Sequence, residues 1–476
     1  MIRGGMLVFS ALSMLPLAAL PARAQDDDEL AKIQHFEGGT IRLSLGTASL
    51  ALLGPGVATQ QASVAPIYPG PGRQLHNPAL LGMLRRPLLA ADIAPRLDLD
   101  LGRFVDLDAR LSEETDDLLA DHLAEGGELV ASRGEAAVYH PGGLGAAGLV
   151  LPGALGTLAL SIDAPFALDL DVLATGIQAW ADIEKTVEEH TETIALRADL
   201  DLAARLTLRA RRYSLAVGRQ MGPDLWLGAG VDWLELSARV DGLADTEGMM
   251  ATGGREFAFG DPSDPWENSL DQSLTGDYAG RGWTLRLGLG WRPLPALAIG
   301  LVYQRLPSLA LEGEAALSLH RLAAYADGGI DPSELSLSRP TETEVVTSPV
   351  GETLTVELPS SLSLGLAGRF GPLTASLDGS LFQGDFRVAY LDAEGRLRPA
   401  GLVKVGLATG PLSLSLGLLL ARPQVHVNGE TKEFGLLPLP LFGLGGGARL
   451  NDHLRLDAAL GAAPLPSLRV SAALLF

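Results

Sequence analysis

The histidines and cysteines decide first which metal and nucleophile chemistry this chain can carry. None of the eight histidines stands four residues from another, as zinc ligands on one helix face do, and the sequence contains no cysteine. Thiol catalysis, zinc–thiolate sites and disulfides are therefore excluded. We find neither a nucleophile elbow nor a defensible pair of catalytic carboxylates. We expect no enzymatic activity, no metal site and no cofactor.

Two short motifs imitate ligand sites. Gly143–Gly148 fits the dinucleotide pattern G-x-G-x-x-G, but His140-Pro141 precede it and Pro152 follows closely, so the required strand and helix have no room. A glycine-rich strand or turn is the better interpretation. Asp26-Asp27-Asp28 lacks the spaced oxygen ligands and the turn glycine of a calcium loop, and is expected to be a solvated acidic segment.

Charged side chains recur at alternate positions of long segments. From Thr193 to Arg209, leucine, isoleucine and alanine occupy the even positions and charges occupy many odd ones. Only an extended strand places such a set on one face. A charged face is expensive in a dry core and cheap in a water-filled lumen. We therefore expect a hydrated lumen lined by Arg197, Asp199, Asp201, Arg205, Arg286 and Arg369.

The elements that must position these charges are β-strands. Alternation predicts about fourteen: residues 154–161, 164–175, 193–208, 212–220, 225–240, 283–292, 296–304, 361–370, 373–382, 401–409, 412–421, 440–450, 453–460 and 466–476. A further strand near Arg96 would shift this count. Short Pro-, Gly- or Asn-containing turns alternate with long connections such as 241–282. Trp283 and Trp291 bracket one apolar band, as interfacial aromatics do. The predicted fold is an all-β, transmembrane antiparallel β-barrel.

Two smaller elements are expected outside this ladder. Residues 113–135 have apolar spacing near three to four and favour a short helix. Residues 309–319 and 353–358 are expected to pair as a hairpin beyond the membrane.

The ends of the chain indicate export and assembly. Residues 1–24 have the layout of a signal peptide cleaved after Ala24, and no later segment offers 18 uncharged apolar residues. The net charge of −21 argues against nucleic acid as a partner. The last strand ends at Phe476 and resembles the signal that the outer-membrane barrel assembly machinery recognises. We expect localisation in a bacterial outer membrane, among its lipids.

The segment before the barrel carries a family resemblance. A fourteen-stranded barrel would leak unless plugged, and residues 25–95 precede a barrel of residues 96–476. Within the segment, Asn77-Pro78-Ala79 resembles the Asn-Pro-Ala motif of the FadL family of outer-membrane transporters for long-chain fatty acids and aromatic hydrocarbons. The resemblance implies an N-terminal plug that ends near this motif.

The expected function is admission of a hydrophobic small molecule, fatty-acid-like or hydrocarbon-like, across the outer membrane. By resemblance, such a ligand would meet the long loops, pass behind the plug and leave sideways into the bilayer. Three alternatives stay open: a porin for polar solutes, a structural barrel linked to secretion or conjugation, and a soluble secreted β-sandwich or solenoid.

Overall fold

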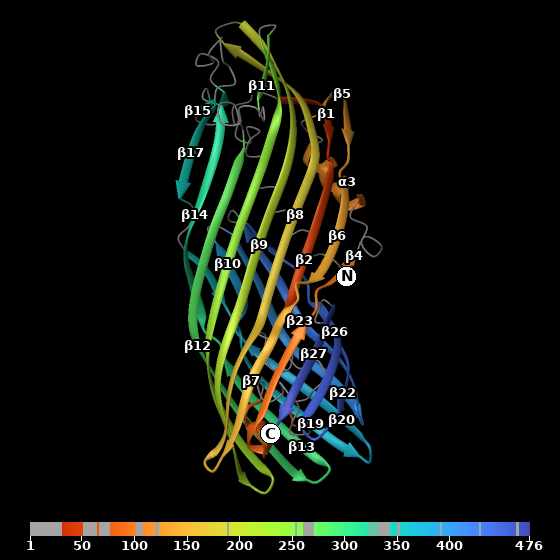
Figure 1. The fold of residues 1–476 in the computed structure, drawn as a ribbon. Coiled ribbons are helices and arrows are strands. Elements are labelled where there is room, and N and C mark those ends of the chain that lie inside the picture. Colours follow the sequence, from red (N-terminus) through yellow and green to blue (C-terminus); the bar gives the residue numbers. More distant parts are fainter. Residues whose placement is uncertain are drawn as a thin grey trace.

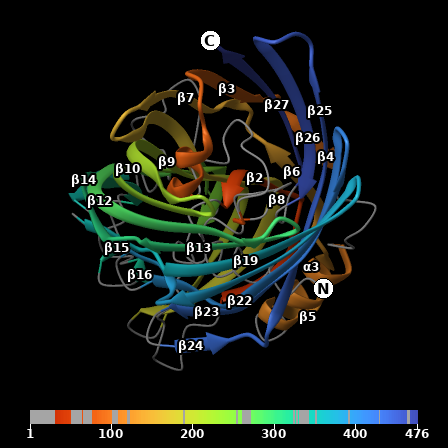
Figure 2. The ribbon, with the colours of Figure 1, turned by 90° about the horizontal axis from the view of Figure 1, so that it is seen from below.

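The wall of the protein is a closed ring of fourteen antiparallel strand positions (Figures 1 and 2). The computed structural model describes residues 31–50, 64–65, 77–100, 108–119, 123–187, 190–252, 255–259, 271–322, 325–326, 329–330, 343–349, 353–390, 393–427, 430–462 and 466–476. In order, the ring contains β3 (Leu88–Ala94), β7 (Gly143–Gly153), β8 (Gly156–Val187), β9 (His190–Gly222), β10 (Leu225–Thr252), β12 (Gln272–Leu294), β13 (Leu297–Arg305) with β14 (Ser308–Leu322), β18 (Thr353–Glu357) with β19 (Ser360–Phe370), β20 (Leu373–Gln383) with β21 (Phe386–Tyr390), β22 (Ala393–Thr409), β23 (Leu412–Val427), β25 (Leu437–Arg449), β26 (Leu454–Ala462) and β27 (Pro466–Leu475). The last strand, β27, pairs with β3 and closes the ring, so the predicted fold class is confirmed.

The predicted number of strands is right because two errors cancel. Segments 154–161 and 164–175 belong to one strand, β8, and segments 193–208 and 212–220 belong to β9. This splitting counts two strands too many, and the omission of β3 and β7 from the prediction counts two too few. The strand expected near Arg96 exists as β4 (Leu97–Asp100), but it pairs with β6 outside the ring.

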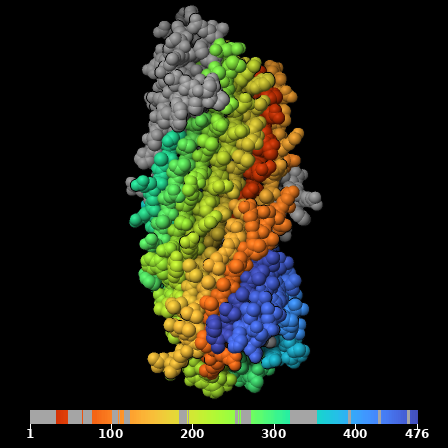
Figure 3. Space-filling model, viewed as in Figure 1, coloured from red at the N-terminus to blue at the C-terminus, as the bar shows by residue number. Residues whose placement is uncertain are grey.

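The two rims differ as predicted. Five predicted tight turns connect β9–β10, β12–β13, β19–β20, β22–β23 and β25–β26 at the lower rim. The upper side departs from the prediction, because much of the expected loop 241–282 consists of the extended ends of β10 and β12 together with β11 (Arg255–Phe259). Strands β8, β9 and β10 therefore extend from the lower to the upper part of the molecule, whereas β25 to β27 occupy only its lower part (Figures 1 and 3).

Polarity inverts along these long strands. The face of β10 that carries Gly228 is the lumen face, because a Cβ there would lie 2.2 Å from the carbonyl carbon of Pro78, inside the ring. Low on the strand the outer face is apolar, with Leu227 41% and Val231 44% exposed. Higher up, the lumen face carries the buried Leu234 and Leu236 instead.

We call the lower zone the membrane band and the upper zone the tower. The band bears exposed outward side chains such as Leu160, Leu215, Leu287, Val405, Leu416, Leu444, Leu460 and Val470. Trp283, 64% exposed, stands at its upper edge on β12 and meets Trp233 edge to face at 4.7 Å. An apolar exterior suits hydrocarbon, and a charged exterior suits water, so the inversion marks the level where the barrel leaves the bilayer.

The tower has a packed apolar interior. Its core joins side chains of β8, β9, β10, β12, β14 and β18, namely Phe166, Leu208, Ala210, Leu234, Leu236, Ala238, Tyr278, Leu306, Leu309, Leu311, Ala315, Leu354, Val356 and Leu358. The predicted pairing of 309–319 with 353–358 is confirmed within it, by β14 and β18.

Four of the six charges predicted to line the lumen lie outside. Arg197, Asp199, Asp201 and Arg205 share the odd-numbered face of β9 with Leu215 and Val217, and the β9–β10 register runs uninterrupted across them. The prediction was wrong because it assumed that the apolar face of this segment contacts lipid, whereas in the tower the apolar face is internal. On the solvent-exposed surface of the tower these charges contact other side chains. Arg205 donates a hydrogen bond to Asp171, and the guanidinium of Arg197 lies 5.1 Å from the ring centre of Trp180.

Further strands extend the tower sheet beside β8. Both β1 (Ala31–Glu37) and β2 (Thr40–Leu50) pair with β8 antiparallel, while β5 (Leu123–Val130) and β6 (Arg133–His140) pair with them in parallel. The helix expected within 113–135 overlaps α3 (Asp108–Leu119), whereas residues 123–130 and 133–135 of that range lie in β5 and β6. Shorter strands are β15 (Tyr325–Ala326), β16 (Gly329–Ile330), β17 (Thr343–Pro349) and β24 (Glu430–Glu433). No helix in the described ranges has the length and apolar character needed to span a membrane.

Candidate functional site

A short helical plug lies against the inner wall of the barrel, drawn in orange-red inside the ring in Figure 2. It is the 3₁₀-helix η3 (Pro78–Met83), capped by Asn77, whose Oδ1 accepts a hydrogen bond from the Ala79 N–H at 3.0 Å. Proline fits the first helical position because the N–H it lacks has no helical partner there. Asn77 and Pro78 through Gly82 are buried. The motif found in the sequence thus starts the helix and faces the wall.

Asn77 also ties two pieces of the plug to the barrel. Its Nδ2 donates to the Val64 carbonyl at 2.8 Å and to the Leu289 carbonyl of β12 at 3.4 Å. The Val64 N–H in turn donates to Oδ1 of Asp378, on β20, at 3.1 Å. We call this chain of contacts, from β12 through Asn77 and Val64 to Asp378, the latch. It runs inside the barrel between β12 and β20, which are separated by β13 and β19, and the side chains of Asn77, Val64 and Asp378 are buried.

Glycines in the wall make the seat of the plug possible. A Cβ on Gly288 would lie 2.3 Å from the Asn77 Oδ1, and the one on Gly228 would meet the backbone of Pro78. Gly228 and Gly288 are paired across β10 and β12, so they form one flat patch. Only residues without side chains allow the plug backbone to approach this closely.

A polar layer lies one step above the seat. Arg286 pairs with Asp232 through bonds of 2.6 and 2.9 Å, and Asp232 also accepts from the Thr284 hydroxyl at 2.7 Å. Beside it, Arg212 binds both carboxylate oxygens of Asp163, at 2.5 and 2.8 Å. From the lower rim upward, the interior therefore contains first the plug, then the layer of ion pairs, and then the apolar core of the tower. Removing one partner of such a buried pair leaves a costly unpaired charge.

The other predicted site residues lie apart from the plug. Arg286 faces the lumen in the polar layer, whereas Arg369 is exposed next to the β19–β20 turn, where its N–H donates to the Ala296 carbonyl at 2.8 Å. Trp291 is 46% exposed near the lower rim. Phe476 is 64% exposed, and its N–H donates to the Pro87 carbonyl at 3.1 Å.

Sequence reasoning missed four charged residues of the lumen. The residues that were not predicted are Asp163, Arg212, Asp232 and Asp378. Each is a charged residue on a strand face whose neighbouring lumen-facing residues are mostly small or carry a hydroxyl group. Asp232 between Val231 and Trp233 carried the clearest signal, an acid at the alternate position of an apolar strand. Residues 25–95 also prove to be divided: β1 and β2 join the tower, Val64 and η3 lie in the lumen, and β3 is a wall strand.

Comparison with known proteins gives structural likeness alone. No protein-family model and no curated protein sequence matches the chain. Among solved structures, it is similar to a Pseudomonas aeruginosa FadL homologue (13% identity, 90% of this chain and 98% of the other, TM-score 0.46). It is also similar to the CymD monoaromatic hydrocarbon channel (14%, 90% and 99%, TM-score 0.43) and to the Ralstonia pickettii toluene transporter TbuX (13%, 90% and 98%, TM-score 0.42).

Proposed function

We propose that this chain is a plugged outer-membrane channel that admits hydrophobic small molecules of the fatty-acid or hydrocarbon kind. One observation carries the proposal: above the membrane band the interior is lined by apolar side chains such as Leu234, Leu311 and Val356, each fully buried. A solute that enters along the axis by displacing these packed side chains therefore meets hydrocarbon before it meets charge. Such a path favours apolar solutes and costs polar ones their hydration.

The same observation disfavours a porin for sugars or ions. A porin keeps a wide, water-filled lumen lined by polar groups. Here the tower core is packed, and the polar layer beneath it consists of charges that are already paired with one another.

The plug supplies the gate of the proposed channel. Its latch is a small number of hydrogen bonds, each worth about 0.5–1.5 kcal/mol, so ligand binding can displace it. As the resemblance to FadL-type transporters implies, we propose that the ligand then passes behind the plug and leaves sideways into the bilayer.

The maturation of the chain belongs to the same proposal. We propose that residues 1–24 are cleaved after Ala24, residues that lie outside the described part of the chain. We also propose that β27 with its terminal Phe476 is the strand recognised by the barrel assembly machinery, and that the mature barrel lies among outer-membrane lipids.

Uptake and permeation measurements test the function together. Cells that make the protein should accumulate a labelled fatty acid or aromatic hydrocarbon faster than cells that lack it. Liposomes containing the purified barrel should not swell in isotonic sugar. Equal uptake across a broad panel of hydrophobic compounds would favour a scaffold role, and swelling at porin rates would contradict the plug.

A further inference from the structure

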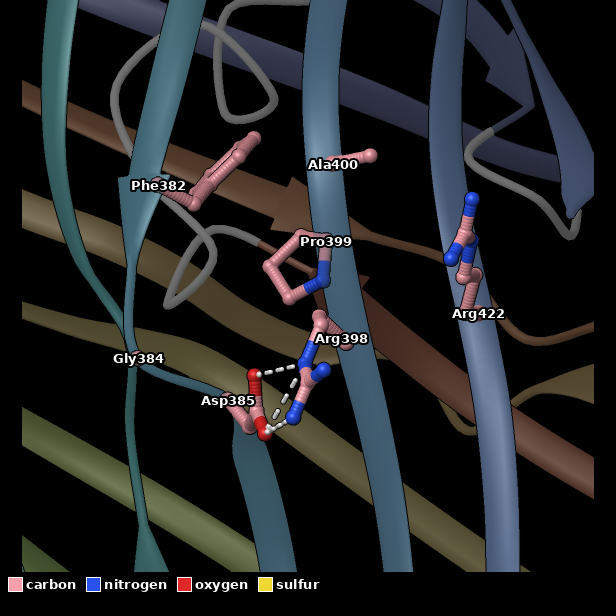
Figure 4. Close-up of a pocket in the computed structure, with 7 residues that line it drawn as sticks. All are labelled: Phe382, Gly384, Asp385, Arg398, Pro399, Ala400 and Arg422. Atoms are coloured by element: carbon pink, nitrogen blue, oxygen red, sulfur yellow. Dashed lines mark hydrogen bonds and ion pairs between the residues drawn. The ribbon is translucent and has the colours of Figure 1, made fainter. Parts of the chain in front are cut away.

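The barrel wall has an opening between β20–β21 and β22. β22 pairs with β20 as far as Leu402, and with β21 from Leu397 onward. Between these two ladders, the described residues 381–385 and 398–401 do not pair with each other, although each segment keeps strand pairing on its other side. Gly384 turns the chain there with φ +90°, and β22 has a bulge between Pro399 and Gly401. A pocket of about 390 Å³ occupies the opening, lined by Phe382, Gly384, Asp385, Arg398, Pro399, Ala400 and Arg422 (Figure 4).

The mouth of this pocket lies at the upper edge of the membrane band. Below it, the outer face carries Val403 on β22 and Leu418 on β23, which are 57% and 41% exposed. Arg422 continues the same even-numbered outer face of β23, two residues beyond Leu420. Its guanidinium is therefore at the level where hydrocarbon gives way to lipid headgroups, on the side of the long connections, which faces outward in such barrels.

Two arginines of this mouth are set directly opposite each other. Arg398 and Arg422 are register partners across β22 and β23, an arrangement that destabilises a sheet unless an anion compensates it. Arg398 has such an anion, because its guanidinium donates hydrogen bonds to both carboxylate oxygens of Asp385 at 3.1 Å, as the dashed lines of Figure 4 show. Among the described residues, Arg422 has no carboxylate within ion-pair distance.

The inner end of the pocket is apolar. Phe382 packs against the buried cluster of Leu402, Leu419 and Leu441, and Pro399 is buried. The opening thus combines one uncompensated guanidinium at the headgroup level with an apolar recess that leads inward. An amphiphile with an anionic head fits this combination.

We propose that the pocket binds an outer-leaflet lipid whose headgroup phosphate pairs with Arg422 and bridges it to Arg398. The phosphate compensates Arg422, as Asp385 compensates Arg398, and an acyl chain lies over the exposed Val403 and Leu418. A guanidinium binds phosphate through two parallel hydrogen bonds, and phosphate is the anion that lipid headgroups present at this level. This site is distinct from the plug, and it stands whether or not the barrel transports hydrophobic compounds.

Native mass spectrometry of the full-length barrel tests the proposal. The protein in non-ionic detergent is mixed with lipid A that carries both phosphates, with dephosphorylated lipid A, or with inorganic phosphate. Wild type should retain one phosphorylated lipid A, and Arg422→Gln should bind it at least about tenfold more weakly, the loss of one charge-assisted contact. Dephosphorylated lipid A should bind wild type as weakly as the intact lipid binds the variant.

The matched control is Arg281→Gln. Arg281 is another outward arginine above Trp283, 68% exposed, but it stands 3.7 Å from Glu235, and we expect its variant to bind like wild type. Heat-modifiable gel mobility confirms that each variant is folded. Equal retention by Arg422→Gln and wild type overturns the proposal. Displacement of the lipid by low millimolar inorganic phosphate alone would assign the site to free anions instead.

Discussion

Replacing Asn77 by alanine should unlatch the plug. The change removes the bond to the Ala79 N–H and the two bonds from Nδ2, and it leaves the Val64 carbonyl without that donor. The bond to the Ala79 N–H lies within the plug and is made in either state, so only the two bonds from Nδ2 count. At about 0.5–1.5 kcal/mol for each, the plugged state should lose roughly 1–3 kcal/mol, and the displaced population should rise about 5- to 150-fold. The barrel itself should remain folded, since its ladders do not involve this side chain.

Single-channel recording in planar bilayers measures this population directly. Wild type should be closed almost continuously, and Asn77→Ala should show frequent openings. Asn451→Ala is the matched control, because Asn451 caps a lower-rim turn through bonds from the His453 and Leu454 N–H groups. If Asn77→Ala were as quiet as wild type while Asn451→Ala were also quiet, the latch would not hold the plug and our reasoning would be refuted.

Three further predictions concern the seat, the tower and its surface. Gly228→Ala should displace the plug and raise conductance, because its methyl group meets the Pro78 backbone, whereas Gly395→Ala, with open space around it, should not. Leu236→Ala should leave a cavity in the tower core and cost about 2–5 kcal/mol in urea unfolding; a loss below about 1 kcal/mol would indicate a loosely packed tower. Hydrogen bonding to Arg387 lowers the pKa of Glu394 below its ordinary 4.5, so its stabilising contribution is complete above that pH and is lost as pH falls through the lowered value. The stability advantage of wild type over Glu394→Gln should shrink in that acidic range, and a constant difference would contradict the assignment.

Period-two alternation was sufficient to predict the fold class. The alternation at Leu285 and Leu287 of β12, the tight turns and the terminal strand depend only on residues close to one another in the sequence. They can therefore be recognised without knowing which strands pair. Strand ends were less predictable, because β8 and β9 continue straight through positions where the apolar face changes sides. The change was visible in the sequence, since even positions are apolar up to Leu208 and odd ones from Tyr213. The change of face predicts two strands, but β9 is a single strand whose outer face contacts water in the tower and lipid in the membrane band.

The site was predictable only in part, for a related reason. The Asn77-Pro78-Ala79 motif could be found by resemblance, but Leu289, which binds Asn77, is 212 residues away, and Asp378 is 314 residues from Val64, which it binds. Which residues face one another across a barrel depends on register, and alternation alone leaves register undetermined. Arg286 could therefore be assigned to the polar face of its strand, whereas its partner Asp232 could not be identified.

The height of the tower bears on how a hydrophobic molecule reaches a bacterium at all. The nineteen residues of β10 that follow Trp233, at about 3.3 Å each, carry the strand roughly 60 Å beyond the bilayer surface along its own length. In the channel proposed above, the buried apolar side chains of the tower, such as Leu236 and Met250, would therefore meet a hydrophobic solute well outside the bilayer.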